Sequence, residues 1–135
     1  MNLSKYIGIP HKIRGREWDG LDCWGLVHMF YKTELGIELP NYSDLYDEPR
    51  DEKQVSSLVD VEKRTFECIS KPEPFAIMLM SFRQLTCHIG IVIDENHFLH
   101  SLDGHESAIE RLDSPTWKHR IRGFYRTRNL SGQPV

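Results

Sequence analysis

The chain has 135 residues, of which 39% are hydrophobic and 27% are charged, with a formal net charge of −3. This size and composition are typical of one globular domain, which we expect over residues 1–130, followed by a disordered tail at 131–135. The negative charge gives no electrostatic basis for binding nucleic acid or an anionic membrane. The longest apolar run, residues 75–80, is too short for a membrane span. The first ten residues lack the apolar core of a signal peptide, and three cysteines predict free thiols, so we expect synthesis in the cytoplasm.

The N-terminal third predicts a helix that begins at a cysteine. Residues 15–20 are polar and flanked by glycine, which is typical of a loop, and apolar residues recur at helical spacing from Leu26 to a C-cap at Gly36. Asp22 is a natural N-cap, which places Cys23 in the first turn, where unpaired N–H groups and the helix dipole favour a thiolate. Cys23 is therefore a candidate nucleophile.

Free cysteines also occur as small buried hydrophobic residues. That remains the alternative for Cys23. It is the interpretation that we favour for Cys68 and Cys87, because neither of them opens a helix.

The rest of the chain predicts one more helix and then a series of strands. Helical spacing returns at about residues 50–62, and beyond it the hydrophobic period changes to two. Turn residues separate the expected strands at 65–69, 75–81, 86–93, 97–101, 107–110 and 121–126. Helices followed by antiparallel strands indicate an α+β fold.

Two histidines occur on consecutive predicted strands. Alternation places His88 and Gly90 on one face of the first strand. A turn at residues 94–96 joins it to the next strand as a hairpin, so His88 should be a neighbour of His100. One imidazole can then act as general base to Cys23 while the other fixes its tautomer. We expect Gly90 to leave room for the helix that carries Cys23.

A zinc site is a further alternative, because Cys87, His88 and His100 are all possible ligands. Cys87 and His88 are adjacent on a strand and point to opposite faces, and no paired ligand spacing is present. We therefore expect neither a metal nor a cofactor. Half-buried side chains with satisfied hydrogen bonds are expected at the other histidines considered, His28, His97, His105 and His119.

Charge is distributed unevenly along the chain. Residues 44–52 are acidic, and residues 118–128 contain basic side chains and no acid. Such a stretch is a solvated surface or a docking patch for a partner protein. Its basic residues are Lys118, Arg120, Arg122, Arg126 and Arg128.

Several segments match a known pattern in their order along the chain. They are IGIPH at residues 7–11, GLDCWGLV at 20–27, CHIGIV at 87–92 and FLHS at 98–101. Together they resemble the NlpC family of cell-wall cysteine peptidases, a compact papain-like group. The tryptophan after the cysteine, ERLDSPTW at 110–117 and IRGFYR at 121–126 are similar to the branch of that family encoded with phage tail-assembly genes.

The resemblance implies a papain-like fold, with N-terminal helices packed on an antiparallel sheet. It also implies hydrolysis of the stem peptides of peptidoglycan, typically at the γ-D-glutamyl–diaminopimelate bond. In this pattern Cys23 is the nucleophile, His88 the general base and acid, and His100 the orienting residue. The oxyanion would be held by the Cys23 N–H and a group from the opening segment.

Three further residues are expected to support the oxyanion or bind substrate. His11 stands where many relatives carry tyrosine. The other two, Asp22 and Trp24, flank the nucleophile.

A cell-wall hydrolase made in the host cytoplasm without a signal peptide would reach its substrate as part of a virion. We therefore expect a tail-associated endopeptidase that opens the wall during infection, with other tail proteins as partners. One alternative is a structural tail-tip or assembly protein with a peptidase fold and little activity. Another is a cysteine acyltransferase or amidase that uses the same site.

Overall fold

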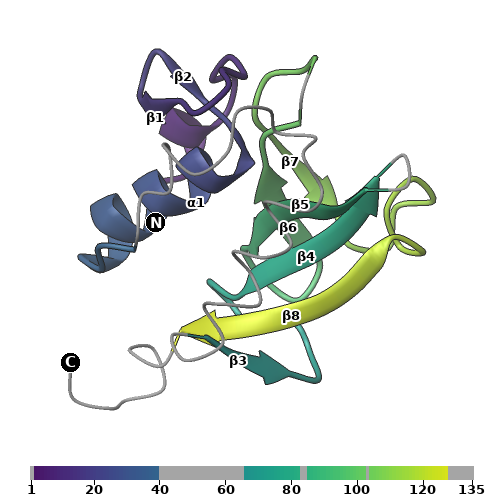
Figure 1. Cartoon of the computed structure of the whole chain (residues 1–135). Coiled ribbons are helices and arrows are strands. Elements are labelled where there is room, and N and C mark those ends of the chain that lie inside the picture. Colours follow the sequence, from purple (N-terminus) through teal and green to yellow (C-terminus); the bar gives the residue numbers. More distant parts are fainter. Residues whose placement is uncertain (1, 40–65, 83–84, 103, 128–135) are drawn as a thin grey trace.

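The computed structural model describes residues 2–39, 66–82, 85–102 and 104–127. Helices lie in the N-terminal part and strands in the rest, which confirms the α+β prediction (Figure 1). The N-terminal elements are the 3-10 helix η1 (Ser4–Tyr6), β1 (Arg16–Glu17), β2 (Gly20–Leu21), α1 (Cys23–Phe30) and the π-helical turn η2 (Tyr31–Leu35). The later strands are β3 (Phe66–Ile69), β4 (Ile77–Phe82), β5 (Leu85–Val92), β6 (His97–His100), β7 (Ala108–Arg111) and β8 (Ile121–Thr127).

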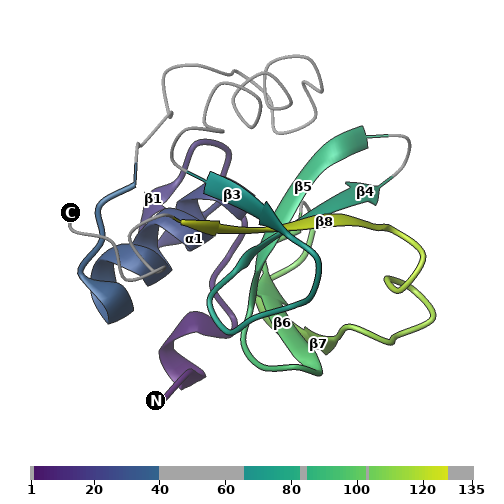
Figure 2. The same ribbon diagram turned by 90° about the horizontal axis from the view of Figure 1, so that it is seen from below.

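Strands β3 to β8 form one six-stranded antiparallel sheet in the order β3-β8-β4-β5-β6-β7. Each begins and ends within two residues of its predicted bounds where these are described. The last strand, β8, lies between β3 and β4 (Figure 2). The predicted helix at 50–62, the acidic stretch at 44–52 and the tail at 131–135 fall outside the described residues.

The predicted helix forms as expected at both ends. The Asp22 side chain accepts a hydrogen bond from the Gly25 N–H, which is the geometry of an N-cap, and α1 starts at Cys23. The helix continues through η2 to Gly36, whose φ of 66° ends it in the left-handed region that glycine tolerates. The preceding segment, predicted as loop, contains the short antiparallel pair of β1 and β2.

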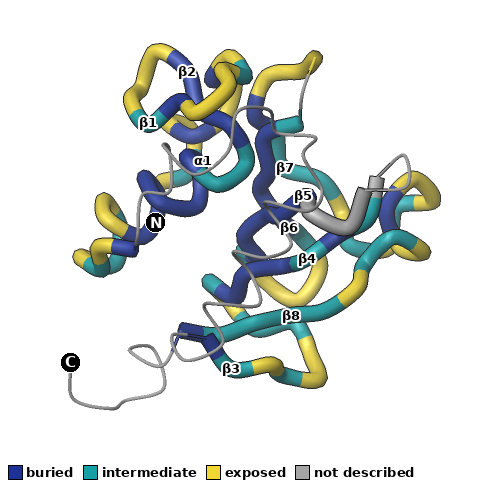
Figure 3. Tube along the Cα trace, in the orientation of Figure 1, coloured by how far each residue is buried: buried dark blue, intermediate teal, exposed yellow. Residues whose placement is uncertain are grey.

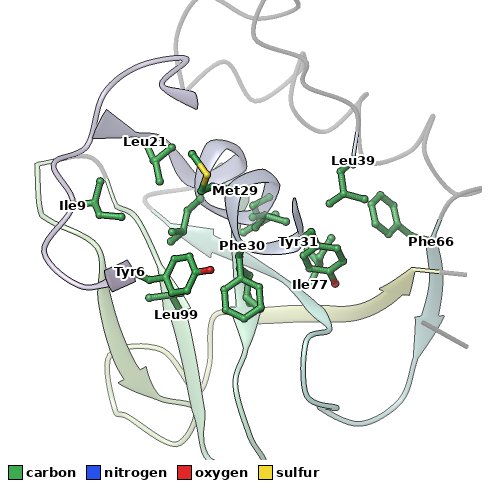
Figure 4. Close-up of a cluster of buried hydrophobic side chains, with 14 residues drawn as sticks. Tyr6, Ile9, Leu21, Met29, Phe30, Tyr31, Leu39, Phe66, Ile77 and Leu99 are labelled. Carbon is green, nitrogen blue, oxygen red and sulfur yellow. The ribbon is translucent and has the colours of Figure 1, made fainter. Parts of the chain in front are cut away.

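Hydrophobic residues are buried on both faces of the sheet. One cluster lies between α1 and the sheet and contains Leu26, Phe30, Ile89 and Leu99 (Figure 4). Strand alternation places the second cluster on the opposite face, where its members are Ala76, Met78, Met80, Val92, Phe98 and Trp117. The central strands are correspondingly buried (Figure 3).

Gly90 does not make room for α1, contrary to our expectation. A Cβ atom built on it would lie 2.9 Å from the carbonyl oxygen of Leu99, 3.2 Å from Cβ of His100 and 3.2 Å from Cε of Met80. Gly90 pairs directly with His100 across β5 and β6 and shares the face of the second cluster, whereas α1 packs on the other face. The missing side chain therefore leaves room for the imidazole of His100.

No helix within the described ranges is long and apolar enough to cross a membrane.

Candidate active site

The two strand histidines are in direct contact. His88 Nε2 lies 2.8 Å from His100 Nδ1, and both side chains are buried. The contact follows from the register, since Gly90 stands opposite His100 and His88 is two residues before Gly90 on the same face. The predicted hairpin and the predicted proximity of the two histidines are confirmed.

The contact continues to a carboxylate that sequence reasoning did not select. His100 Nε2 is hydrogen-bonded to Glu110 Oε2, which also accepts a bond of 3.0 Å from Nε1 of Trp117. The Trp117 ring packs against His100 edge to face, with ring centroids 4.9 Å apart. A signal was present, because an acid in a strand next to the histidine strand is within reach of its side chains.

Cys23 is half-buried at the first position of α1. The turn before it is fixed by the carboxylate of Asp22, which is completely buried. Its Oδ1 accepts from Gly25 N at 2.7 Å and from Arg16 Nη1 at 2.9 Å, and its Oδ2 accepts from Arg14 N at 3.0 Å. Asp22 thus ties the preceding loop to the first turn of the helix.

A buried serine joins the cysteine segment to the histidine strand. The hydroxyl of Ser101, directly after His100, donates to the carbonyl oxygen of Leu21 at 2.9 Å. Leu21 is two residues before Cys23, and α1 packs against β5, which carries His88. The N-terminal end of α1 is therefore tied to the end of β6 that carries His100.

Burial dominates the electrostatics of the pair. It holds the pKa of His88 well below its usual value, and the neighbouring His100 and His11 lower it further. His11 is thus close enough to His88 to influence its charge. The hydrogen bond from His100 lowers the pKa of Glu110, which favours the carboxylate. At neutral pH His88 is a neutral ring that can accept a proton.

The two residues that flank Cys23, Asp22 and Trp24, both make local contacts. Asp22 caps the helix, as described above. Trp24 is partly buried against the first hydrophobic cluster and meets Phe66 edge to face, with centroids 6.3 Å apart and planes at 90°. Both side chains therefore stabilise the segment around Cys23.

The expectations for four single residues are wrong. His105 and His119, expected to be half-buried, are exposed. Cys68 is exposed rather than buried, because it lies on β3, an edge strand of the sheet. His28 is buried, and its Nδ1 has no hydrogen-bond partner among the described residues. The side chain of Cys87 lies outside the described part of the structure.

The basic stretch is partly neutralised. Arg126 forms ion pairs with Glu67 at 2.7 Å and Glu73 at 3.3 Å, both outside the stretch itself. Arg122 donates to the carbonyl oxygen of His119 at 3.1 Å. Arg128 lies outside the described residues. The stretch is therefore a mixed surface rather than a uniform cationic one.

A cavity of about 630 Å³ lies beside the histidine–carboxylate contact. It reaches His100 and Glu110, and its wall includes Gly8, Glu106 and Trp117. Within the described ranges, no group of three or more histidine, cysteine or acidic residues is arranged to hold a metal ion.

Known proteins share this fold. The NlpC/P60 domain of the peptidoglycan hydrolase SagA matches with a TM-score of 0.61 at 17% identity, covering 92% of each chain. A NlpC/P60 family protein from Bacillus cereus matches with a TM-score of 0.66 at 20% identity, covering 90% of this chain and 36% of its own. These matches confirm the predicted papain-like architecture.

Relatives by sequence are longer proteins. The murein DD-endopeptidase MepS/murein LD-carboxypeptidase of Escherichia coli (strain K12) is 26% identical over 113 residues, which cover 84% of this chain and 53% of that protein. The gamma-DL-glutamyl hydrolase of Bacillus subtilis (strain 168) is 27% identical over 129 residues, which cover 95% of this chain and 28% of that protein. The chain thus spans about half of the first relative and less of the second. Residues 8–126 match the family model, and the chain belongs to the NlpC/P60 family.

Proposed function

We propose that this protein is a cysteine peptidase that hydrolyses peptide bonds in peptidoglycan. The observation that carries the proposal is the buried contact between His88 and His100, tied through the hydrogen bond from Ser101 to Leu21 to the segment that leads into Cys23. Family membership supports a cysteine nucleophile, and two relatives are named as hydrolases of murein and of γ-glutamyl bonds.

In the proposed mechanism, His88 takes the proton of the Cys23 thiol. Nε2 of His88 contacts His100, so Nδ1 is the ring nitrogen to which the mechanism assigns the thiol proton. The thiolate adds to the carbonyl carbon of the scissile amide, and the Cys23 N–H at the start of α1 stabilises the oxyanion. The imidazolium of His88 then protonates the leaving amine, and a thioester remains on Cys23. Water, deprotonated by His88, releases the acid and restores the thiol.

His11, Asp22 and Trp24 have supporting roles in this proposal. From the opening segment, His11 is the candidate that would stabilise the oxyanion, because its charge contributes to lowering the pKa of His88. Asp22 and Trp24 hold the nucleophile segment in place through the cap and the aromatic contact. The γ-D-glutamyl–diaminopimelate bond is the proposed site of cleavage, which the family resemblance and the γ-glutamyl relative support.

Digestion of purified sacculi tests this function. The wild type should release muropeptides cut at one stem-peptide bond, as read by mass spectrometry. Cys23→Ala and His88→Ala should release none, because the nucleophile or the proton carrier is missing. His100→Ala should retain about 0.1–10% of the rate, because the base remains and only its orientation is lost.

The matched control is Cys68→Ala, which removes an exposed thiol on β3 and should leave the digest unchanged. Identical digests from the wild type and Cys23→Ala would contradict the proposal. A product other than a cleaved stem peptide, such as a transferred acyl group, would favour the acyltransferase or amidase alternative.

We further propose that the protein is made in the cytoplasm and reaches the wall as part of a phage tail. The support is the similarity of residues 110–117 and 121–126 to the tail-assembly branch. Tails carrying Cys23→Ala should assemble normally and infect less well where the wall is highly cross-linked. Reversing charge at Lys118, Arg120 and Arg122 should weaken incorporation, more so at high salt. Failure of Cys23→Ala to assemble would favour a structural tail protein instead.

A further inference from the structure

Glu110 is an acidic residue hydrogen-bonded to His100, and the mechanism above does not use it. It lies on β7 and pairs with Phe98 of β6. The side chains of Glu110, Phe98 and His100 therefore lie on the same face of the sheet. Its Oε2 receives the Trp117 indole N–H at 3.0 Å and is hydrogen-bonded to His100 Nε2. The two contacts hold the carboxylate at one end of a continuous path that runs through His100 to His88.

The chemistry of the donors determines how protons are placed along this path. An indole N–H only donates hydrogen bonds and a carboxylate only accepts them, so Glu110 must accept a hydrogen bond from a proton that stays on His100 Nε2. A neutral His100 then has a lone pair on Nδ1, which can only accept from His88 Nε2. Neutral His88 is left with its own lone pair on Nδ1. That is the tautomer that can take a proton from a thiol.

We propose that Glu110 is a positioning residue that acts through His100: it selects the tautomers of both histidines and stabilises the imidazolium of His88 by its charge. This inference rests on the proposed function, in which His88 is the general base. It assigns a fourth member, on a neighbouring strand, to the set formed by Cys23, His88 and His100.

Other ionisable groups lie near the path from Glu110 through His100 to His88 and affect its pH dependence. His11 acts on His88 from the opening segment. His105 acts on Glu110 from the loop before β7. Arg120 lies over the Trp117 ring, with its guanidinium carbon 5.8 Å from the centroid. All three are cationic when protonated, and Glu110 is the carboxylate hydrogen-bonded to the histidine pair among them.

Two substitutions at Glu110 separate the acceptor from the charge. Glu110→Ala removes both, and kcat should fall about tenfold to a hundredfold with KM within about twofold, because the proposed effect is on the base and not on substrate binding. Glu110→Gln keeps an acceptor oxygen, so its kcat should fall less than that of Glu110→Ala. The acidic limb of its kcat/KM against pH should move down by about half a unit or more, since protonation of His88 sets that limb and the imidazolium loses a nearby anion.

The matched control is Glu106→Gln, which removes one negative charge from the wall of the same cavity. Glu106 is exposed, and the structure gives no contact between it and either histidine. This control should keep the wild-type kcat and the wild-type pH profile. Wild-type kcat and an unmoved acidic limb in both Glu110 variants would overturn the proposal.

Nitrogen-15 spectra of the imidazole rings test the tautomers without any turnover. Neutral His88 and His100 should both carry their proton on Nε2 in the wild type, and Glu110→Ala should show a mixture. A neutral His100 protonated on Nδ1 in the wild type would overturn the proposal even in a fully active enzyme. By contrast, correct tautomers in a protein that cleaves no sacculus would leave Glu110 in place and remove the proposed function.

Discussion

His88 is a buried imidazole whose surroundings favour the neutral ring. Burial lowers its pKa first, and the neighbouring His100 and His11 add to that effect. His28 is a second case, in which burial again lowers the pKa and the charges of Arg16 and Lys32 act in the same direction. Both histidines are therefore more readily protonated in the unfolded chain than in the fold.

This difference predicts a loss of stability in mild acid. A depressed pKa gives stability that is complete above the unfolded value of about 6.5 and is lost as pH falls below it. Each of the two buried histidines should therefore lower the free energy of unfolding by up to about 1.4 kcal/mol between pH 7.5 and pH 5.5. Urea unfolding at the two pH values measures the difference.

His88→Gln should reduce that pH dependence, because glutamine does not titrate. His119→Gln is the control, since His119 is exposed, and it should leave the difference as in the wild type. A protein equally stable at both pH values would show that His88 and His28 are protonated in the fold as easily as outside it.

At the scale of elements, the sequence predicted the pieces better than their arrangement. Period-two patterns and turn residues located the described strands, and the N-cap and C-cap located the helix, because these signals are local. The pair of β1 and β2 escaped notice because two residues are too few to show a period. The place of β8 between β3 and β4 depends on long-range pairing, which chain order does not reveal.

The same limit applies to the candidate site. His88 and His100 could be paired in advance because one tight turn joins their strands, so the register follows from the sequence. Glu110 was missed although it lies on the neighbouring strand, and the contact of Ser101 could not be foreseen. Both contacts depend on how far a side chain reaches, across strands for Glu110 and between segments for Ser101. Gly90 was misplaced for a related reason, since the sequence shows its alternation but not which face α1 covers.

At the scale of the molecule, two buried serines connect the N-terminal part to the sheet. Ser101 donates to the Leu21 carbonyl oxygen at 2.9 Å. Ser107, just before β7, donates to the Tyr6 carbonyl oxygen at 2.6 Å and accepts from Ile9 N at 2.8 Å. The first bond acts on the segment that leads into Cys23, and the others act on the segment that follows η1. The hydrophobic cluster under α1 stabilises the packing of the helix on the sheet by burying apolar surface. The directional serine hydrogen bonds align the N-terminal segments with the strands.

The two serines offer a matched pair for testing alignment. Ser101→Ala removes the hydroxyl that donates to the Leu21 carbonyl oxygen. Ser107→Ala removes the donor to the Tyr6 carbonyl oxygen and the acceptor of the Ile9 N–H. Each should lower the free energy of unfolding by about 1–3 kcal/mol in urea. Turnover on sacculi should respond differently. Ser101→Ala should reduce kcat more than Ser107→Ala, at a temperature where both remain folded, because it loosens the end of α1 that carries Cys23 against the strand of His100. Equal kcat values in the two variants would mean that hydrophobic packing alone aligns the nucleophile with the histidines.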